Sequence, residues 1–180
     1  MKKLVVEATL ESSASEQKTP PSKEALKVTS IGGIFHVNMN CENFERSRAF
    51  YERVGLQMIL EFPEGEYPDV GRGLGVGRHR VKGALMMIGS DPSATFLDLL
   101  EWIEPKHEPR SRPALTETGV HRLALRTTAF EDEVERLRQA GMSFVNEPIT
   151  VVGPTGQSGR FVCFPDPDGN MLELLEVGPQ

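Results

Sequence analysis

The chain has 180 residues, of which 38% are hydrophobic and 26% charged, and its net charge is −6 at pH 7. This composition is ordinary for a globular protein, and the length suits one compact domain or two small fused modules. The acidic balance argues against a nucleic-acid partner, which normally requires a basic face. No apolar run approaches the ~20 residues that cross a bilayer, so we expect no membrane partner.

Residues 1–30 are rich in Ser, Glu, Lys, Thr and Pro, which predicts a flexible or loosely docked tail. The opening MKKLVVEATL is similar to a signal peptide, but Glu7 interrupts its short apolar stretch. The two cysteines, Cys41 and Cys163, are expected to be free thiols. Together these features predict a cytoplasmic protein.

Residues 31–106 are expected to form a first βαβββ module. Apolar residues alternate with polar ones from Phe35 to Met39, as in a half-buried strand. The amphipathic stretch that follows predicts a helix, with Asn43 as its N-cap and Gly55 as its stop. The segments GALMMIGS and TFLDLLEW supply the closing strands.

Between the second and third strands lies a polar, glycine-rich segment, EGEYPDVGRGLGVGRHR. Its glycines do not match G-x-G-x-x-G and no clear helix follows, which argues against a nucleotide cofactor. We expect a mobile loop beside the site instead. His79 and His107 lie in polar loop sequence and are expected in solvent.

A charged linker over residues 107–118 leads to a second module over residues 119–178. Its helix is expected to begin at a capping box, Thr128 to Glu131, and to end at Gly141. The strands GRFVCF and NMLELLEV follow, joined by the turn-forming PDPDG. The predicted fold class is α+β, with two βαβββ modules forming a cupped mixed sheet around a central cavity.

Two carboxylates occupy matching places in the last strand of each module, Asp98 in FLDLLEW and Glu173 in NMLELLEV. Both lie in apolar runs, where an ionised acid costs on the order of several kcal/mol unless it is paired or bound to a metal. His36 shares its strand face with Asn38, opposite the apolar residues that should meet the helix. We predict that these side chains converge on one small-molecule site.

The fourth position of this site has two alternatives. Aligning the glycines that end the two helices places Arg122 opposite His36, and a one-residue bulge would bring His121 there instead. With His121 inward, two imidazoles and two carboxylates suit a divalent metal. With Arg122 inward, a guanidinium neutralises Asp98 and Glu173.

The segments HVNMNCENFERSRAFYERVGLQM and FPDPDGNMLELLE resemble the vicinal oxygen chelate superfamily, which includes glyoxalase I, bleomycin-resistance proteins and extradiol dioxygenases. The resemblance spans residues 33–177 and implies a homodimer whose modules surround a metal-centred cavity. The alternative with His121 inward would suit one divalent metal such as Zn, Fe, Mn, Co or Ni. By the resemblance, its ligands would come from the first and last strand of each module: His36, Asp98, His121 or Arg122, and Glu173.

We therefore predict a glyoxalase-like enzyme acting on a small carbonyl-containing or oxygenated substrate by lyase or isomerase chemistry. Arg122 or a metal would stabilise an oxyanion, and Glu173 or Asp98 would move a proton. The substrate is expected to lie against Asn38, Phe96, Leu100, Trp102 and Met86. The alternatives are a metal-free binding or drug-sequestering protein of the bleomycin-resistance type and, as a weaker variant, an Fe(II) dioxygenase.

Overall fold

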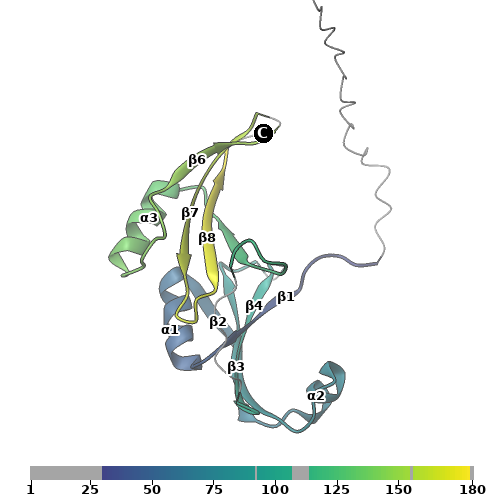
Figure 1. Ribbon diagram of the computed structural model, residues 1–180. Coiled ribbons are helices and arrows are strands. Elements are labelled where there is room, and N and C mark those ends of the chain that lie inside the picture. The colour runs from purple at the N-terminus through teal and green to yellow at the C-terminus, as the bar shows by residue number, and fades with distance from the viewer. Residues whose placement is uncertain (1–29, 92, 107–113, 155, 179–180) are drawn as a thin grey trace, which may run out of the picture. The chain divides into compact units, whose positions relative to one another are not determined.

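The computed structural model describes residues 30–91, 93–106, 114–154 and 156–178, and both modules belong to the compact unit that begins at Ile34. Nearly all of the predicted tail and much of the predicted linker lie outside the described residues, as does His107. Figure 1 shows the elements in chain order: β1 (His36–Cys41), α1 (Phe44–Val54), β2 (Leu56–Gly65), α2 (Pro68–Leu74), β3 (Arg80–Ile88), β4 (Phe96–Glu104), β5 (Arg122–Arg126), α3 (Phe130–Gln139), β6 (Ile149–Val152), β7 (Ser158–Pro165) and β8 (Met171–Val177).

The strands of the described residues form two four-stranded sheets with the same topology. Sheet A has the order β1-β4-β3-β2, and sheet B has the order β5-β8-β7-β6. In each sheet the first strand of the module runs parallel to its last strand, and the other neighbours are antiparallel. The α+β class and the two βαβββ modules are therefore confirmed, each module having its own mixed sheet.

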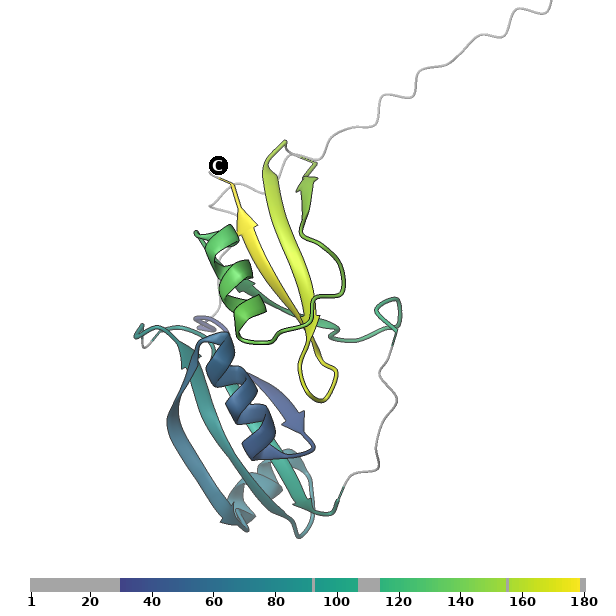
Figure 2. The same cartoon turned by 90° about the vertical axis from the view of Figure 1, so that its left-hand side faces the viewer.

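Helix α1 forms where the sequence predicts it. Asn43 is the N-cap, and its side-chain oxygen accepts a hydrogen bond of 2.9 Å from the backbone N–H of Arg46. Gly55 adopts the left-handed conformation, with φ 119°, that ends the helix. The helix lies over sheet A, and α3 lies over sheet B (Figure 2). The buried side chains of α1 are Phe44, Ser47, Phe50, Tyr51 and Val54.

Helix α3 begins differently from the prediction. The expected capping box does not form, because Ala129 is the N-cap and makes no side-chain hydrogen bond. The Thr127 hydroxyl oxygen accepts a bond of 3.0 Å from the Ala129 N–H instead. The helix still buries Phe130, Val134 and Leu137, so its apolar stripe, rather than a capping box, holds it in place.

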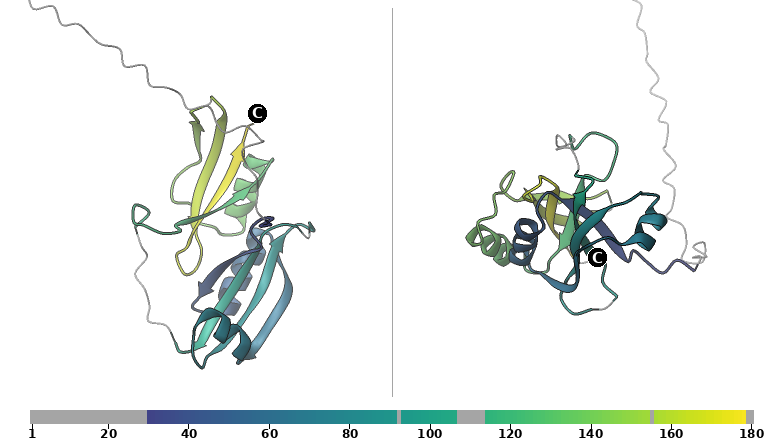
Figure 3. Two further views of the ribbon diagram at one scale, coloured as in Figure 1. Left: turned by 90° about the vertical axis from the view of Figure 1, so that its right-hand side faces the viewer. Right: turned by 90° about the horizontal axis from the view of Figure 1, so that it is seen from below.

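The glycine-rich segment after β2 contains a short helix, α2, where the sequence analysis expected a mobile loop. It lies at the end of sheet A where the chain passes from β2 to β3 (Figure 3). His79, expected in solvent, is only 3% exposed. A Cβ added at Gly71 would lie 2.4 Å from Cε1 of His79, so the helix backbone packs directly on the imidazole ring. The loop and solvent predictions were wrong because packing, not an apolar period, specifies this element.

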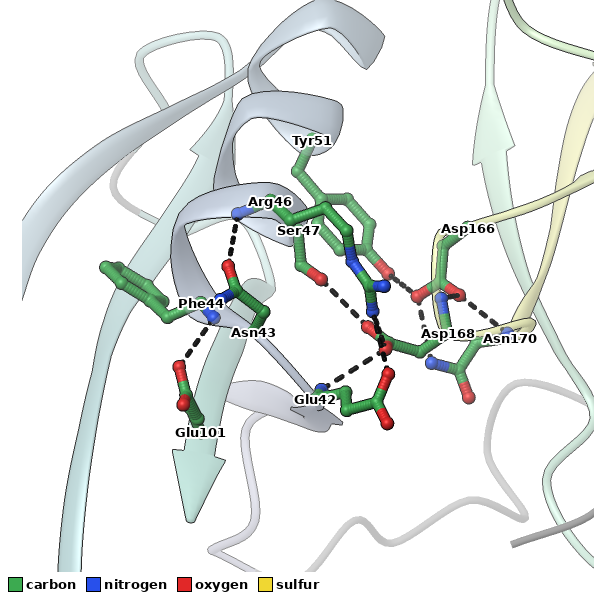
Figure 4. A network of polar contacts seen from close by, with 10 residues as sticks. All are labelled: Glu42, Asn43, Phe44, Arg46, Ser47, Tyr51, Glu101, Asp166, Asp168 and Asn170. Atoms are coloured by element: carbon green, nitrogen blue, oxygen red, sulfur yellow. Dashed lines mark hydrogen bonds and ion pairs between the residues drawn. The ribbon is translucent and has the colours of Figure 1, made fainter. Parts of the chain in front are cut away.

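A polar network joins the turn between β7 and β8 to α1 (Figure 4). Asp166 is buried, and its carboxylate accepts a hydrogen bond of 2.8 Å from the Tyr51 hydroxyl and further bonds from Asn170. Asp168 accepts a bond of 2.8 Å from the Ser47 hydroxyl. The PDPDG turn of the second module is thereby fixed on the helix of the first.

A second contact between the modules caps the end of α1. The guanidinium of Arg136 in α3 donates to the carbonyl oxygens of Arg53 and Val54 at 2.8 and 2.7 Å. Side chains from both modules also share one hydrophobic core, in which Phe50 and Phe164 are neighbours. Within the described residues, no helix has the length and apolar character needed to cross a bilayer.

Candidate functional site

Each sheet has one face covered by its helix and an opposite face, here called the open face. On sheet A the core residues Leu97 and Leu99 of β4 belong to the helix side. Strand alternation then places the residues of β1 and β4 with even numbers on the open face. These are His36, Asn38, Asn40, Phe96, Asp98, Leu100 and Trp102.

Met86 does not lie where the sequence analysis placed it. Its side chain is 0% exposed and belongs to the core on the helix side of β3. Leu85 pairs in register with Asp98, so Leu85 and Met87 occupy the open face instead. The prediction for Met86 was wrong because two adjacent methionines give no alternation from which to choose a face.

The first polar group of the site combines His36 with Asp98. Nε2 of His36 lies 3.9 Å from Oδ2 of Asp98. The Asn38 side-chain amide donates to the same oxygen at 3.1 Å and to the Asp98 backbone carbonyl at 3.2 Å. The other carboxylate oxygen, Oδ1, is buried and has no hydrogen-bond partner among the described residues. An unpaired buried acceptor of this kind is costly. The Asp98 side chain is 18% exposed, so the accessible part of the carboxylate is not this oxygen.

The second polar group combines Arg122 with Glu173 on the open face of sheet B. Nε of Arg122 lies 3.2 Å from Oε2 of Glu173, whose side chain is only 10% exposed. Cys163 of β7 is beside them, with its Sγ 3.9 Å from the same carboxylate oxygen. Burial raises the pKa of the Cys163 thiol, the charge of Glu173 raises it further, and Arg122 opposes this effect.

The pairing register places Arg122 in sheet B where His36 stands in sheet A. Each pairs with the residue two positions before the acid of the last strand, Phe96 for His36 and Met171 for Arg122. The pairing of β5 with β8 runs without a shift, so no bulge turns His121 toward Glu173. His121 precedes β5, and its Nε2 is buried without a hydrogen-bond partner in the described residues.

The side chains expected to converge do not form one cluster within a single chain. Across the described part of the chain, no three His, Cys, Asp or Glu side chains lie close enough together to hold a metal ion. His36 and Asp98 form one pair, and Glu173 is paired with the guanidinium of Arg122. Within the described part of one chain, neither pair supplies the three or four ligands of a metal centre.

Asn40 and His79, which were not predicted as site residues, both contact Trp102 on the open face of sheet A. The indole N–H of Trp102 donates to the Asn40 side-chain oxygen at 3.0 Å. The rings of Trp102 and His79 lie 5.7 Å apart, centre to centre. The alternation in the sequence places Asn40 on the same polar strand face as His36 and Asn38, although it gives Asn40 no site role. No sequence signal would have found His79, which reaches Trp102 only through the folding of α2.

Two βαβββ modules, each with an acid in its last strand, are typical of a glyoxalase-like fold. Residues 33–174 match the Glyoxalase/Bleomycin resistance protein/Dioxygenase superfamily, and the chain belongs to this family. The chain is 31% identical over 147 residues to YwkD, an uncharacterized protein of Bacillus subtilis (strain 168), covering 81% of this chain and 98% of that protein.

Solved structures share this fold. A glyoxalase family protein from Bacillus cereus has a TM-score of 0.69 and 20% identity, covering 86% of this chain and 100% of the other. A glyoxalase/dioxygenase from Nostoc punctiforme has a TM-score of 0.56 and 24% identity, covering 84% and 99%. At these identities the likeness extends to the fold alone, and the reaction depends on the side chains of this chain.

Proposed function

We propose that the protein is an enzyme that moves a proton at a carbon next to a carbonyl group of a small molecule, in lyase or isomerase chemistry. The observation that supports this is the contact between Glu173 and Arg122, a carboxylate and a cation with little solvent around the acid. His36 and Asp98 repeat the arrangement at the matching register of the other sheet. Each pair includes an acid able to exchange a proton.

In the proposed reaction Glu173 is the general base. Its carboxylate takes the proton from the carbon. The electron pair of the C–H bond forms a carbon–carbon double bond, and the π pair of the carbonyl group moves onto its oxygen. The Arg122 guanidinium is next to this base and donates hydrogen bonds to the developing oxyanion. The proton then returns to the substrate, which leaves Glu173 ionised. The exposed part of the Asp98 carboxylate accepts a hydrogen bond from a hydroxyl group of the substrate.

A homodimer is part of the proposal. In one chain the open faces remain largely uncovered, since His36, Asn38 and Asn40 of sheet A and Arg122 and Arg126 of sheet B are all exposed. A second copy would allow sheet A of one chain to meet sheet B of the other and would unite the two polar groups. Mixing Asp98→Asn chains with Glu173→Gln chains tests this arrangement directly.

After random mixing of equal amounts, half of the dimers contain one chain of each variant. If the site is shared, each of these dimers has one intact site and one site that carries both substitutions. Mixing after dissociation should therefore restore about a quarter of the wild-type rate, although each variant alone is inactive. If each site lies within one chain, mixing restores nothing. Light scattering on the same samples reports whether the protein is a dimer at all.

The assay for the proton transfer is deuterium uptake from D₂O at the carbon next to the carbonyl, followed by NMR. A panel of small ketones and 2-oxo acids supplies the probes. Glu173→Gln should lower the exchange rate by about 10²- to 10⁴-fold, the usual contribution of a positioned acid–base group, while ligand binding persists. Exchange at the wild-type rate in Glu173→Gln would remove this residue from the mechanism.

Binding without turnover is the second candidate, as in drug-sequestering proteins of the bleomycin-resistance type. The observation that favours it is the apolar part of the open face, where Leu100 and Trp102 follow Asp98 along β4. The same panel separates the two functions. Saturable binding with no deuterium uptake by any probe favours sequestration, whereas catalysed uptake favours the enzyme.

A further inference from the structure

The open face of sheet A changes in character along β4. Phe96 begins the strand, Asp98 follows beside His36 and Asn38, and Trp102 lies four residues further along. Leu100 lies between them on the same face. Because a strand rises ~3.3 Å per residue, the backbone of Trp102 is about 13 Å from that of Asp98. The face therefore has a charged part around Asp98 and an aromatic part around Trp102.

The indole of Trp102 is held on two sides. Its only polar atom already donates to Asn40 at 3.0 Å, so it has no hydrogen bond left to give to a ligand. The His79 ring lies 5.7 Å from it, inclined by 51°. His79 is buried, and its Nδ1 lies 2.9 Å from the Gly77 carbonyl oxygen. Trp102 itself remains partly exposed.

The segment behind His79 is itself fixed to the sheet. The Gly71 backbone of α2 packs on the imidazole ring so closely that no side chain fits between them. The Tyr67 hydroxyl donates to the Pro63 carbonyl oxygen at 2.6 Å, and Arg78 pairs with Glu66 at 2.9 Å. The inserted helix therefore supports the ring of His79, and His79 supports Trp102.

Side chains of strand β1 hold both Asp98 and Trp102 in position. Asn38 holds the Asp98 carboxylate, and Asn40, two residues further along, holds the Trp102 indole. Both asparagines lie on the open face, although neither is predicted to react. The spacing between the acid and the indole is thus set by a single rigid strand.

We infer that Trp102, held by Asn40 and backed by His79, forms a specificity subsite for a flat, uncharged group of the substrate, aromatic or unsaturated, attached to the reacting carbonyl by a short linker. The inference rests on the proposed function, which places the carbonyl near the acids. An oriented aromatic surface without a free donor favours apolar, planar groups. The substrate class is therefore aryl-substituted carbonyl compounds rather than the smallest ones.

A matched pair of probes tests the subsite, namely 4-phenyl-2-butanone and 2-butanone, which share a ketone and differ by the phenyl group. Trp102 is the only tryptophan of the chain, so its emission reports on this position alone. The phenyl ketone should change the emission saturably and bind at least about tenfold tighter than 2-butanone, a ratio that an apolar pocket readily provides. Equal affinities, or binding that leaves the emission unchanged, would overturn the inference.

Two asparagine variants separate the two ends of the face. Asn40→Ala releases the indole and should reduce the affinity ratio of the two ketones at least about threefold. Asn38→Ala should leave that ratio unchanged, because Asn38 contacts the Asp98 carboxylate and not the indole. Trp102→Leu, followed by calorimetry, should bring the ratio close to one. An unchanged ratio in both Asn40→Ala and Trp102→Leu would contradict the subsite.

Deuterium uptake by the same ketones distinguishes this inference from the proposed function. Phenyl-selective binding without proton exchange supports the subsite and contradicts the proton-transfer function. Proton exchange at equal affinity for both ketones supports the function and overturns the subsite. Absence of binding by either ketone in calorimetry up to millimolar concentrations contradicts both.

Discussion

Removing the Tyr51 hydroxyl is the sharpest test of how the two modules are joined. Tyr51 is 1% exposed, and its hydroxyl donates to the buried Asp166 carboxylate at 2.8 Å. In Tyr51→Phe this carboxylate loses one donor and no water can replace it without repacking. A hydrogen bond to a charged group contributes about 1.5–3 kcal/mol, and we expect the variant to lose that amount of unfolding free energy.

Urea unfolding followed by circular dichroism measures this loss. With an m value of about 2 kcal/mol/M, the midpoint should fall by about 1 M. Tyr67→Phe is the matched control, since Tyr67 is the other tyrosine and its hydroxyl also donates to one acceptor, the exposed Pro63 carbonyl. We expect the control to lose less than about 0.5 kcal/mol. Equal midpoints in the two variants would refute the role assigned to the Tyr51–Asp166 bond.

The pH dependence gives a second measure of the same residue. Burial raises the pKa of Tyr51 far above its ordinary value of 10.0, and the charge of Asp166 raises it further. The folded state keeps the proton that the unfolded state releases, so this stabilisation is present below pH 10 and is lost as pH rises above it. The loss is about 1.4 kcal/mol per pH unit. Tyr51→Phe lacks this term, and its stability should fall less steeply above pH 10 than that of the wild type.

Three further outcomes are expected. Glu173→Gln should speed alkylation of Cys163 by iodoacetamide at pH 8, because loss of the Glu173 charge lowers the pKa of the thiol. Mass spectrometry measures the rate, and an equal or slower rate would contradict the contact between Cys163 and Glu173. Gly71→Ala should destabilise the protein by about 1–3 kcal/mol and shift the tryptophan emission, because the new methyl group meets His79, whereas Gly73→Ala, with open space around it, should do neither. Proton exchange should survive dialysis against a chelator, since a guanidinium already accompanies Glu173, the proposed base. Loss of exchange that one divalent metal restores would overturn this expectation.

Local patterns in the sequence were enough to predict the repeated fold. The apolar stripe of α1, its Asn43 cap and its Gly55 stop are local signals, and the structure has them as predicted. The strand with Asp98 and the strand with Glu173 were recognised from their apolar runs. Matching the helix-terminating glycines also placed Arg122 opposite His36, the register that the strand pairing has. These features follow from periodicity and turn chemistry, which act over a few residues.

Which side chains meet depends on the packing of the folded chain. The face of Met86, the burial of His79 and the folding of α2 depend on contacts between segments that no local pattern encodes. The sequence also suggested one cluster of acids and imidazoles, whereas a single folded chain has two separate pairs. Periodicity assigns a side chain to a face of its own strand, but the distance between two faces is set by the packing of helices, turns and sheets against one another.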